Sequence, residues 1–358
     1  MTLWSGCQCC LNFKLLEAME STPFIPANPS VEDCWRGVVL YGRNTASYKF
    51  ALATALLELN PKSGQLVKLE DLAPVFARHI ARHLQEAPKQ ITTRDGKFIQ
   101  ACLSYNHDHD LNKLVDVTVD HGFANVIDAF HVVGASPVMH SFYQDERKSN
   151  NGIRITDEFS LLALGLQASN LMQEVEARWR LVETAWNLGI SANLLNVQHD
   201  HAAGEIFTFD QGMRRKNVTS SRSALNGYQK GSCFYCFTDL LLLGEGMNVD
   251  VDHFFPHMLK TQLSSVVDGI WNLVLSCKDC NRGADGKFER IPTVKLLQRL
   301  HTRNEFYIGS HHPLRETLIN QTGKSESERS KFLGQIYQRA QLNPATAWEP
   351  EQRAESLF

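Results

Sequence analysis

Residues 233–236 read CFYC, residues 277–280 read CKDC, and between them residues 248–257 read NVDVDHFFPH. In a Cys-x-x-Cys pair the two-residue spacer lets both sulfur atoms face one point, so two such pairs can hold one zinc ion tetrahedrally. Four thiolates leave no coordination position open, which is typical of a structural zinc site. An alternative is a thiol–disulfide couple, which requires a thioredoxin-like context. We expect structural zinc to be bound by the four cysteines of the two pairs, Cys233, Cys236, Cys277 and Cys280.

The stretch between the two pairs ends a strand-like pattern in two polar side chains. Residues 248–255 alternate in polarity as a strand does, and Asp252 and His253 stand side by side near their end. Consecutive side chains of a strand point to opposite sides, so a regular strand would separate these two groups. A neutral histidine is suited to take a proton from water, whereas Asp252 and Asn281 offer the oxygen ligands that Mg²⁺ or Mn²⁺ prefer. Pro256 lacks an amide donor and would end the strand pairing.

The order of these motifs resembles the HNH endonucleases of the His-Me-finger (ββα-metal) superfamily, in their zinc-stapled form. The resemblance covers residues 233–292, and its parts are Cys-x-x-Cys, Asp-His, Asn-Leu, Cys-x-x-Cys-Asn and a downstream Lys. It implies a metal-dependent hydrolase of DNA phosphodiester bonds, with His253 as the general base. It also implies that Asp252 and Asn281 hold a catalytic Mg²⁺ or Mn²⁺, and that Asn272 orders the loop that positions the histidine. The resemblance further implies that the chain bends at the end of the strand, so that Asp252 and His253 flank the substrate together. Asn281 stands where the final letter of HNH is often His, a substitution that also occurs within the family.

Two alternative functions and the role of one histidine stay open at this stage. A non-catalytic zinc module that binds nucleic acid or protein would need the four cysteines but would have no use for Asp252, His253 and Asn281 together. An HNH-type nuclease that acts on RNA is another alternative. His257, four residues after His253, is either a further contact to the phosphate or an exposed loop histidine.

A basic stretch precedes the first cysteine pair. Residues 211–232 contain five cationic side chains and no acidic one, a pattern typical of contacts to phosphate groups. Two further cations follow the last cysteine and would hold the backbone of the scissile strand. The predicted nucleic-acid contacts are therefore Arg214, Arg215, Lys216, Arg222, Lys230, Arg282 and Lys287.

Composition limits the class of protein. The chain has 358 residues, of which 43% are hydrophobic and 21% are charged, as in globular proteins. No apolar run approaches the roughly 20 residues of a membrane-spanning helix. The net charge of -3 gives no overall attraction to nucleic acid, so binding to DNA requires a local patch. The start of the chain lacks the features of a secretory signal, and we expect a cytoplasmic protein.

Periodicity predicts a mainly α protein with a small α+β module. Capping and stop residues predict a helix over residues 46–60, and amphipathic patterns predict helices over 67–85 and 157–189. His79 and His83 lie four residues apart on one helical face. We interpret these histidines as packing or solvated groups rather than as metal ligands. The expected segments are an N-terminal extension, disordered or spurious, at 1–18; a helical substrate-recognition or regulatory domain at 19–205; the HNH nuclease domain with its zinc knuckles at 206–294; and a helical C-terminal extension at 295–358.

The resemblance also suggests a biological setting. Free-standing nucleases of this kind with a helical domain suggest restriction or antiphage defence in a bacterium, with DNA and the proteins of such a system as partners. A single ββα-metal site cuts one strand, so a double-strand break would require a homodimer or two successive nicks.

Overall fold

The structure is a computed structural model that describes most of the chain in two compact units. One unit, here the N-terminal unit, comprises residues 25–192, and the other, the C-terminal unit, comprises residues 193–358 with the segment up to Phe24. The C-terminal unit therefore includes residues 295–358, which we had treated as an extension. The predicted extension at 1–18 lies outside the described residues, which are 21–42, 46–91, 96–188, 197–200, 202–209, 215–263, 267, 269–310, 314–342 and 347–357.

Helices make up most of the N-terminal unit. They are α2 (Val31–Tyr41), α3 (Tyr48–Leu59), α4 (Leu69–Glu86), α5 (Lys97–Asp108), α6 (Leu111–Val117), a π-helical turn (Thr118–Gly122), α7 (Val126–Ala129), α8 (Arg147–Asn150), α9 (Asp157–Leu164) and α10 (Ala168–Asn187). A small antiparallel sheet has the order β1-β5-β4, and two further strands form a separate pair. The strands are β1 (Leu66–Lys68), β2 (Val132–Val133), β3 (Ser136–Pro137), β4 (Tyr143–Asp145) and β5 (Gly152–Ile155).

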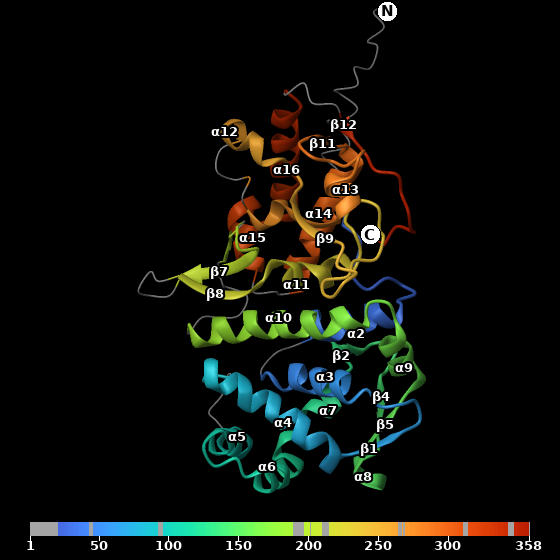
Figure 1. Cartoon of the computed structure of the whole chain (residues 1–358), viewed down its shortest axis with the longest axis vertical. Coiled ribbons are helices and arrows are strands. Elements are labelled where there is room, and N and C mark those ends of the chain that lie inside the picture. The colour runs from blue at the N-terminus through green and yellow to red at the C-terminus, as the bar shows by residue number, and fades with distance from the viewer. Residues whose placement is uncertain are drawn as a thin grey trace, which may run out of the picture. The chain divides into compact units, whose positions relative to one another are not determined.

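The core of this unit lies between α3, α4 and α10. Figure 1 shows α3 packed on α4 and α10 running along α3, and the apolar stripe of α4 faces this core. The helix predicted at 67–85 is thus confirmed as α4. The large side chains buried here are Phe50, Leu72, Phe76, Ile80 and Trp179.

The prediction of one long helix over residues 157–189 is wrong in one respect, because the structure has two helices there, α9 and α10. Gly165 follows α9 with an extended backbone, φ −63° and ψ 151°, and α10 begins at Ala168. The break shifts the helical phase. Leu166, which the periodic pattern assigned to the core stripe, is therefore 77% exposed.

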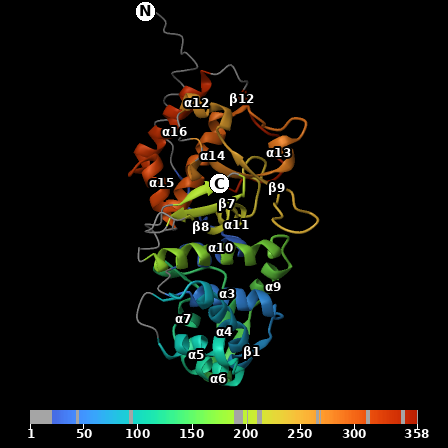
Figure 2. The same cartoon turned by 60° about the vertical axis from the view of Figure 1, so that its left-hand side comes forward.

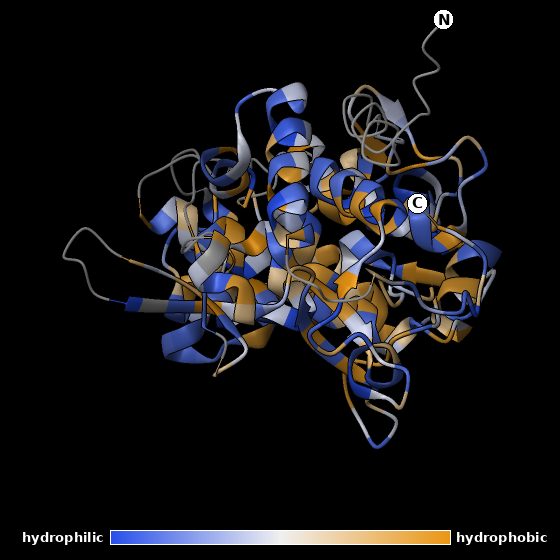
Figure 3. Cartoon of the chain, turned by 90° about the horizontal axis from the view of Figure 1, so that it is seen from above, coloured by the Kyte–Doolittle hydropathy of each residue, from blue (hydrophilic) through white to orange (hydrophobic). Residues whose placement is uncertain are grey.

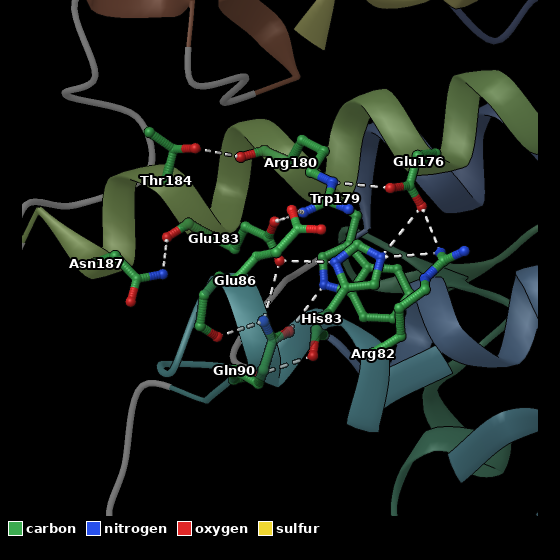
Figure 4. Close-up of polar contacts among 12 residues, drawn as sticks. Arg82, His83, Glu86, Gln90, Glu176, Trp179, Arg180, Glu183, Thr184 and Asn187 are labelled. Carbon is green, nitrogen blue, oxygen red and sulfur yellow. Dashed lines mark hydrogen bonds and ion pairs between the residues drawn. The ribbon is translucent and has the colours of Figure 1, made fainter. Parts of the chain in front are cut away.

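Two helices of the N-terminal unit meet at a buried histidine (Figure 4). The His83 ring of α4 stacks on Trp179 of α10, with ring centroids 3.5 Å apart and planes 2° from parallel. Its Nδ1 and Nε2 atoms lie 2.8 Å from Glu183 Oε2 and 3.1 Å from Glu176 Oε2. Burial lowers the pKa of His83, but the two carboxylates outweigh burial and raise this pKa above its ordinary 6.5. Arg82 donates to the same Glu176 oxygen and Arg180 donates to the other, so that carboxylate is shared by His83 and two arginines.

We expect the N-terminal unit to lose stability as the pH rises through the pKa of His83. A raised folded-state pKa means that the stabilisation is complete below the unfolded-state value of about 6.5 and is lost above the folded-state value. The replacement His83→Gln should remove this dependence. It should also lower the free energy of unfolding by about 1–2 kcal/mol, because the buried Glu183 loses its contact with His83 Nδ1 but keeps its ion pair with Arg180. Urea denaturation at pH 5.5 and pH 9 measures both effects.

The matched control is His79→Gln, one turn earlier on α4. His79 pairs with the half-exposed Glu58. Burial outweighs this carboxylate, so the pKa of His79 is lowered, whereas that of His83 is raised. This variant should keep the fall in stability between the two pH values. A His83→Gln protein with the wild-type pH dependence would contradict the expectation.

The C-terminal unit combines small sheets with helices. Its strands are β6 (Gln198–Asp200), β7 (Glu205–Phe209), β8 (Arg215–Ser220), β9 (Val249–His253), β10 (Leu273–Cys277), β11 (Ile291–Pro292) and β12 (Ala347–Trp348). They form a β6-β7-β8 sheet, the antiparallel pair β9-β10 and the parallel pair β11-β12. Its α-helices are α11 (Ser221–Asn226), α12 (Lys260–Leu263), α13 (Lys278–Arg282), α14 (Val294–Gly309), α15 (Arg315–Thr322) and α16 (Glu326–Gln341), and 3-10 turns cover Gly227–Gln229, His257–Leu259 and Ile270–Asn272.

The three C-terminal helices belong to the core of this unit. Helix α14 packs against both α15 and α16, as Figures 1 and 2 show. Helix α16 begins with a capping box in which Ser325 and Glu328 each accept a backbone amide of the other. Hydrophilic and hydrophobic residues alternate along the helices in Figure 3, as expected for helices with one buried face. The predicted mixture of mainly α structure with small sheets is confirmed for both units.

Among the described residues, no helix is both long enough and apolar enough to span a lipid bilayer.

Candidate active site and metal centre

The antiparallel pair of β9 and β10 forms the centre of the candidate site. Val249 lies opposite Cys277 at one end of the pair, and His253 lies opposite Leu273 at the other. Helix α13 begins directly after Cys277. The register therefore places the second cysteine pair at one end of the strands and the predicted base at the other.

The four predicted zinc ligands come together. Their sulfur atoms all lie within 4.8 Å of one another, and all four side chains are buried. The backbone turns directly after the first cysteine pair, where Phe237 adopts a left-handed conformation with φ 63°. Phe234 N, within the pair, donates to Leu275 O of β10 at 2.9 Å. Tetrahedral Zn–S bonds of about 2.3 Å place two sulfurs about 3.8 Å apart. This agrees with the 3.8 Å between Cys236 Sγ and Cys277 Sγ, so the four cysteines fit a zinc ion.

The four buried thiols alter one another's pKa. Burial raises the pKa of Cys233, and its hydrogen bond with Cys280 raises the pKa of Cys280. The corresponding bond from Cys233 lowers the pKa of Cys236, and it lowers the pKa of Cys277 to about 7. A zinc ion bound at this cluster would deprotonate all four thiols.

Two buried arginines of α14 hold the backbone around the strand pair. Arg299 Nη1 donates to Phe234 O and Tyr235 O, both at 2.7 Å, and Arg303 donates to Leu273 O at 2.6 Å. Burial lowers the pKa of Arg299 to about 10. We did not predict these residues, because in the sequence they look like ordinary charged positions of an amphipathic helix. Only their spacing of four residues, which places both on one face of α14, could have indicated that they are buried.

Asn272 bridges the two ends of the loop between the strands. Its side chain is fully buried, its Oδ1 accepts from Phe255 N at 2.8 Å, and its Nδ2 donates to Phe255 O and Val267 O. Phe254 N also donates to Asn272 O. These bonds fix the backbone immediately after His253, so Asn272 has the loop contacts that the resemblance implies.

His253 and His257 lie close together at the start of this loop. Their ring centroids are 5.8 Å apart and the rings meet edge to face. His253 is 6% exposed, whereas His257 is exposed to solvent. The loop thus presents one buried and one accessible imidazole at the same end of β9.

Asp252 lies among buried polar groups of the C-terminal unit. Its Oδ2 accepts from the buried Tyr235 hydroxyl at 2.6 Å and lies 3.2 Å from Lys287 Nζ. Burial raises the pKa of Asp252, and the Lys287 ammonium opposes this effect. Lys287, which we expected to hold a nucleic-acid backbone, is instead fully buried, because its ammonium pairs with Asp252 inside the unit.

Asn281 contacts the other carboxylate on this side of β9. Its Nδ2 donates to Asp250 Oδ2 at 3.1 Å, and the exposed Arg282 pairs with the same carboxylate at 2.9 Å. The two predicted ligands of the catalytic metal, Asp252 and Asn281, therefore have different partners. Their oxygen donors suit a hard divalent cation, and the position of a cation next to Asp252 is marked by the ammonium of Lys287.

The predicted basic patch is only partly on the surface. Lys230 is 8% exposed and its ammonium lies over the Phe24 ring, because the chain takes a left-handed turn there. Arg215 is exposed but pairs with Asp200 at 2.6 Å. Arg222 is half-buried on α11. Arg214 and the side chain of Lys216 lie outside the described residues.

Comparison of the chain with models of protein families, with curated proteins and with solved structures found no match in any of the three. The functional interpretation therefore depends on the residues and their geometry.

Proposed function

We propose that the C-terminal unit is a zinc-stapled ββα-metal nuclease of the HNH type that hydrolyses DNA. The observation that carries the proposal is the arrangement around β9 and β10. A histidine ends the first strand, a buried asparagine fixes the loop after it, and a short helix follows the second strand. A four-cysteine cluster lies at the opposite end. A zinc module that only binds a partner would not need the Asp252, His253, Asn272 and Asn281 side chains in these positions.

In the proposed reaction His253 accepts a proton from the attacking water, and its neutral imidazole is suited to this near pH 7. The water oxygen bonds to phosphorus as the bridging oxygen leaves with its electron pair. Asn272 positions His253 through the loop backbone. A Mg²⁺ or Mn²⁺ ion at Asp252 and Asn281 would stabilise the negative charge that develops on the phosphate. The zinc at the cysteines would stabilise the fold and take no part in the chemistry.

Arg222, Arg282 and the segment around residue 214 are the proposed contacts to DNA. Arg282 is 60% exposed and lies on α13 next to Asn281, at the side of β9 that carries Asp250. In a chain with net charge -3, such local cations are needed to offset general repulsion of DNA. The N-terminal unit would then select or present the substrate, and restriction or antiphage defence stays the proposed setting.

Cleavage of supercoiled plasmid tests the proposal directly. Full-length protein with Mg²⁺ or Mn²⁺ should convert supercoiled DNA to the nicked form, with linear DNA appearing later if two sites act together. Labelled single-stranded RNA and DNA of the same sequence, run side by side, distinguish a nuclease that acts on RNA. A zinc-loaded, folded protein that binds DNA but leaves every DNA and RNA form intact would favour the non-catalytic alternative.

A further inference from the structure

A buried charge pair occupies the place where the proposed catalytic metal would bind. Asp252 is 8% exposed, and the side chains of Lys287 and Tyr235 are buried beside it. The Lys287 ammonium and the Tyr235 hydroxyl both contact the same oxygen, Asp252 Oδ2, at 3.2 Å and 2.6 Å. The carboxylate therefore already has one full positive charge and one neutral donor.

The position of Lys287 is built into the backbone that follows α13. Lys287 N donates to Cys280 O at 2.6 Å, and Phe288 N donates to Asn281 O at 2.9 Å. Gly286 lies so close to this helix that a Cβ atom there would meet Gly283 N at 2.8 Å. The chain thus folds back beneath the zinc-binding helix and carries Lys287 to Asp252. Lys287 Nζ also donates to Phe288 O at 3.0 Å, which holds the ammonium in the interior.

Two cations compete when they share one buried carboxylate. A divalent ion placed next to Asp252 would be repelled by the ammonium of Lys287, and low solvent exposure leaves this repulsion weakly screened. Removal of the ammonium would leave a buried carboxylate without a counter-ion, and either a proton or a metal cation would then balance its charge.

We propose that Lys287 is an internal counter-ion that competes with the divalent metal for Asp252 and so sets the metal affinity of the site. The proposal rests on the proposed function, because it concerns the metal that this function requires. To bind at Asp252, the metal displaces the ammonium of Lys287. In the absence of the metal the unit stays stable, because Lys287 balances the buried charge of Asp252. Lys287 is thus a positioning residue of the site and makes no contact with the nucleic acid.

The test is Mn²⁺ binding to the zinc-loaded, full-length protein without nucleic acid, measured by electron paramagnetic resonance of free Mn²⁺. Lys287→Met, which keeps the length of the side chain and removes its charge, should bind Mn²⁺ at least about tenfold more tightly than the wild type. Adding Asp252→Asn to the variant should abolish the gain. The control Lys295→Met removes an exposed ammonium that pairs with Glu349 and should leave the affinity unchanged.

If Lys287→Met does not fold, Lys287→Gln serves as a second variant, because the glutamine amide can still donate a hydrogen bond to Asp252. The proposal is overturned if folded Lys287→Met or Lys287→Gln binds Mn²⁺ no more tightly than the wild type. It is also overturned if neither variant folds even with Mn²⁺ added, since Lys287 would then be a purely structural group. Tighter Mn²⁺ binding without any nuclease activity would contradict the proposed function and leave this competition intact.

Discussion

Replacement of Cys277 by serine will release the zinc and unfold the C-terminal unit. Cys277 ends β10, caps the N-terminus of α13 and contributes one of four sulfurs within 4.8 Å of one another. Because a structural site forms only in the folded state, most of its binding free energy, about 10 kcal/mol or more, is folding free energy. The free energy of unfolding of a typical domain is about 5–15 kcal/mol. Loss of the zinc contribution is therefore enough to unfold a domain of ordinary stability. Elemental analysis should find close to one zinc per wild-type chain and almost none in the variant, and circular dichroism should show lost helix.

The matched control is Cys102→Ser. Cys102 is also a fully buried free cysteine, but it lies on α5 in the N-terminal unit and outside the cluster. This variant should lose a little stability and retain its zinc. A Cys277→Ser protein that is folded and free of zinc would refute the structural role of the cluster.

Replacement of His253 by alanine should reduce DNA cleavage by about 10²–10⁴-fold, the usual contribution of a general base. The fold should persist, because the side chain ends a strand whose backbone is held by Asn272. Zinc content and the circular dichroism spectrum check this point. Initial rates of plasmid nicking at saturating Mn²⁺ measure the effect on activity.

His257→Ala is the informative comparison, since the two rings lie 5.8 Å apart and only His257 is exposed. We expect this variant to keep activity within about tenfold of the wild type, because loss of a single auxiliary contact costs about 1 kcal/mol. If His257→Ala abolishes cleavage and His253→Ala does not, the accessible imidazole is the base and our assignment is wrong. Equal activity of all three proteins would exclude a histidine base at this strand end.

Local patterns allowed part of the site to be predicted. Two Cys-x-x-Cys pairs specify their own geometry, and the structure confirms that the four cysteines cluster. The alternation in residues 248–255 predicted a strand, which the structure has as β9. These features depend on neighbours in the sequence, so they can be read without knowledge of the fold.

Contacts made over long sequence separations could not be predicted in this way. Lys287 looks like a surface cation, and only the return of the chain beneath α13 buries it against Asp252. Asn281 faces Asp250 because α13 sets its direction, and no spacing rule distinguishes the two aspartates. The break at Gly165 was missed because apolar residues continue through it with helical spacing. In each case the tertiary structure overrides a local pattern.

The arginines of α14 have a consequence for how the chain is made. During synthesis the two cysteine pairs leave the ribosome before residues 294–309, so the thiols are present before the guanidinium groups that bond to Phe234 O, Tyr235 O and Leu273 O. Until that helix emerges, these carbonyls lack their native donors and the nascent strand pair is incomplete. Because domains fold as units, metal capture and closure of the module should be late events in biogenesis. A ribosome stalled before α14 would therefore carry an immature metal site.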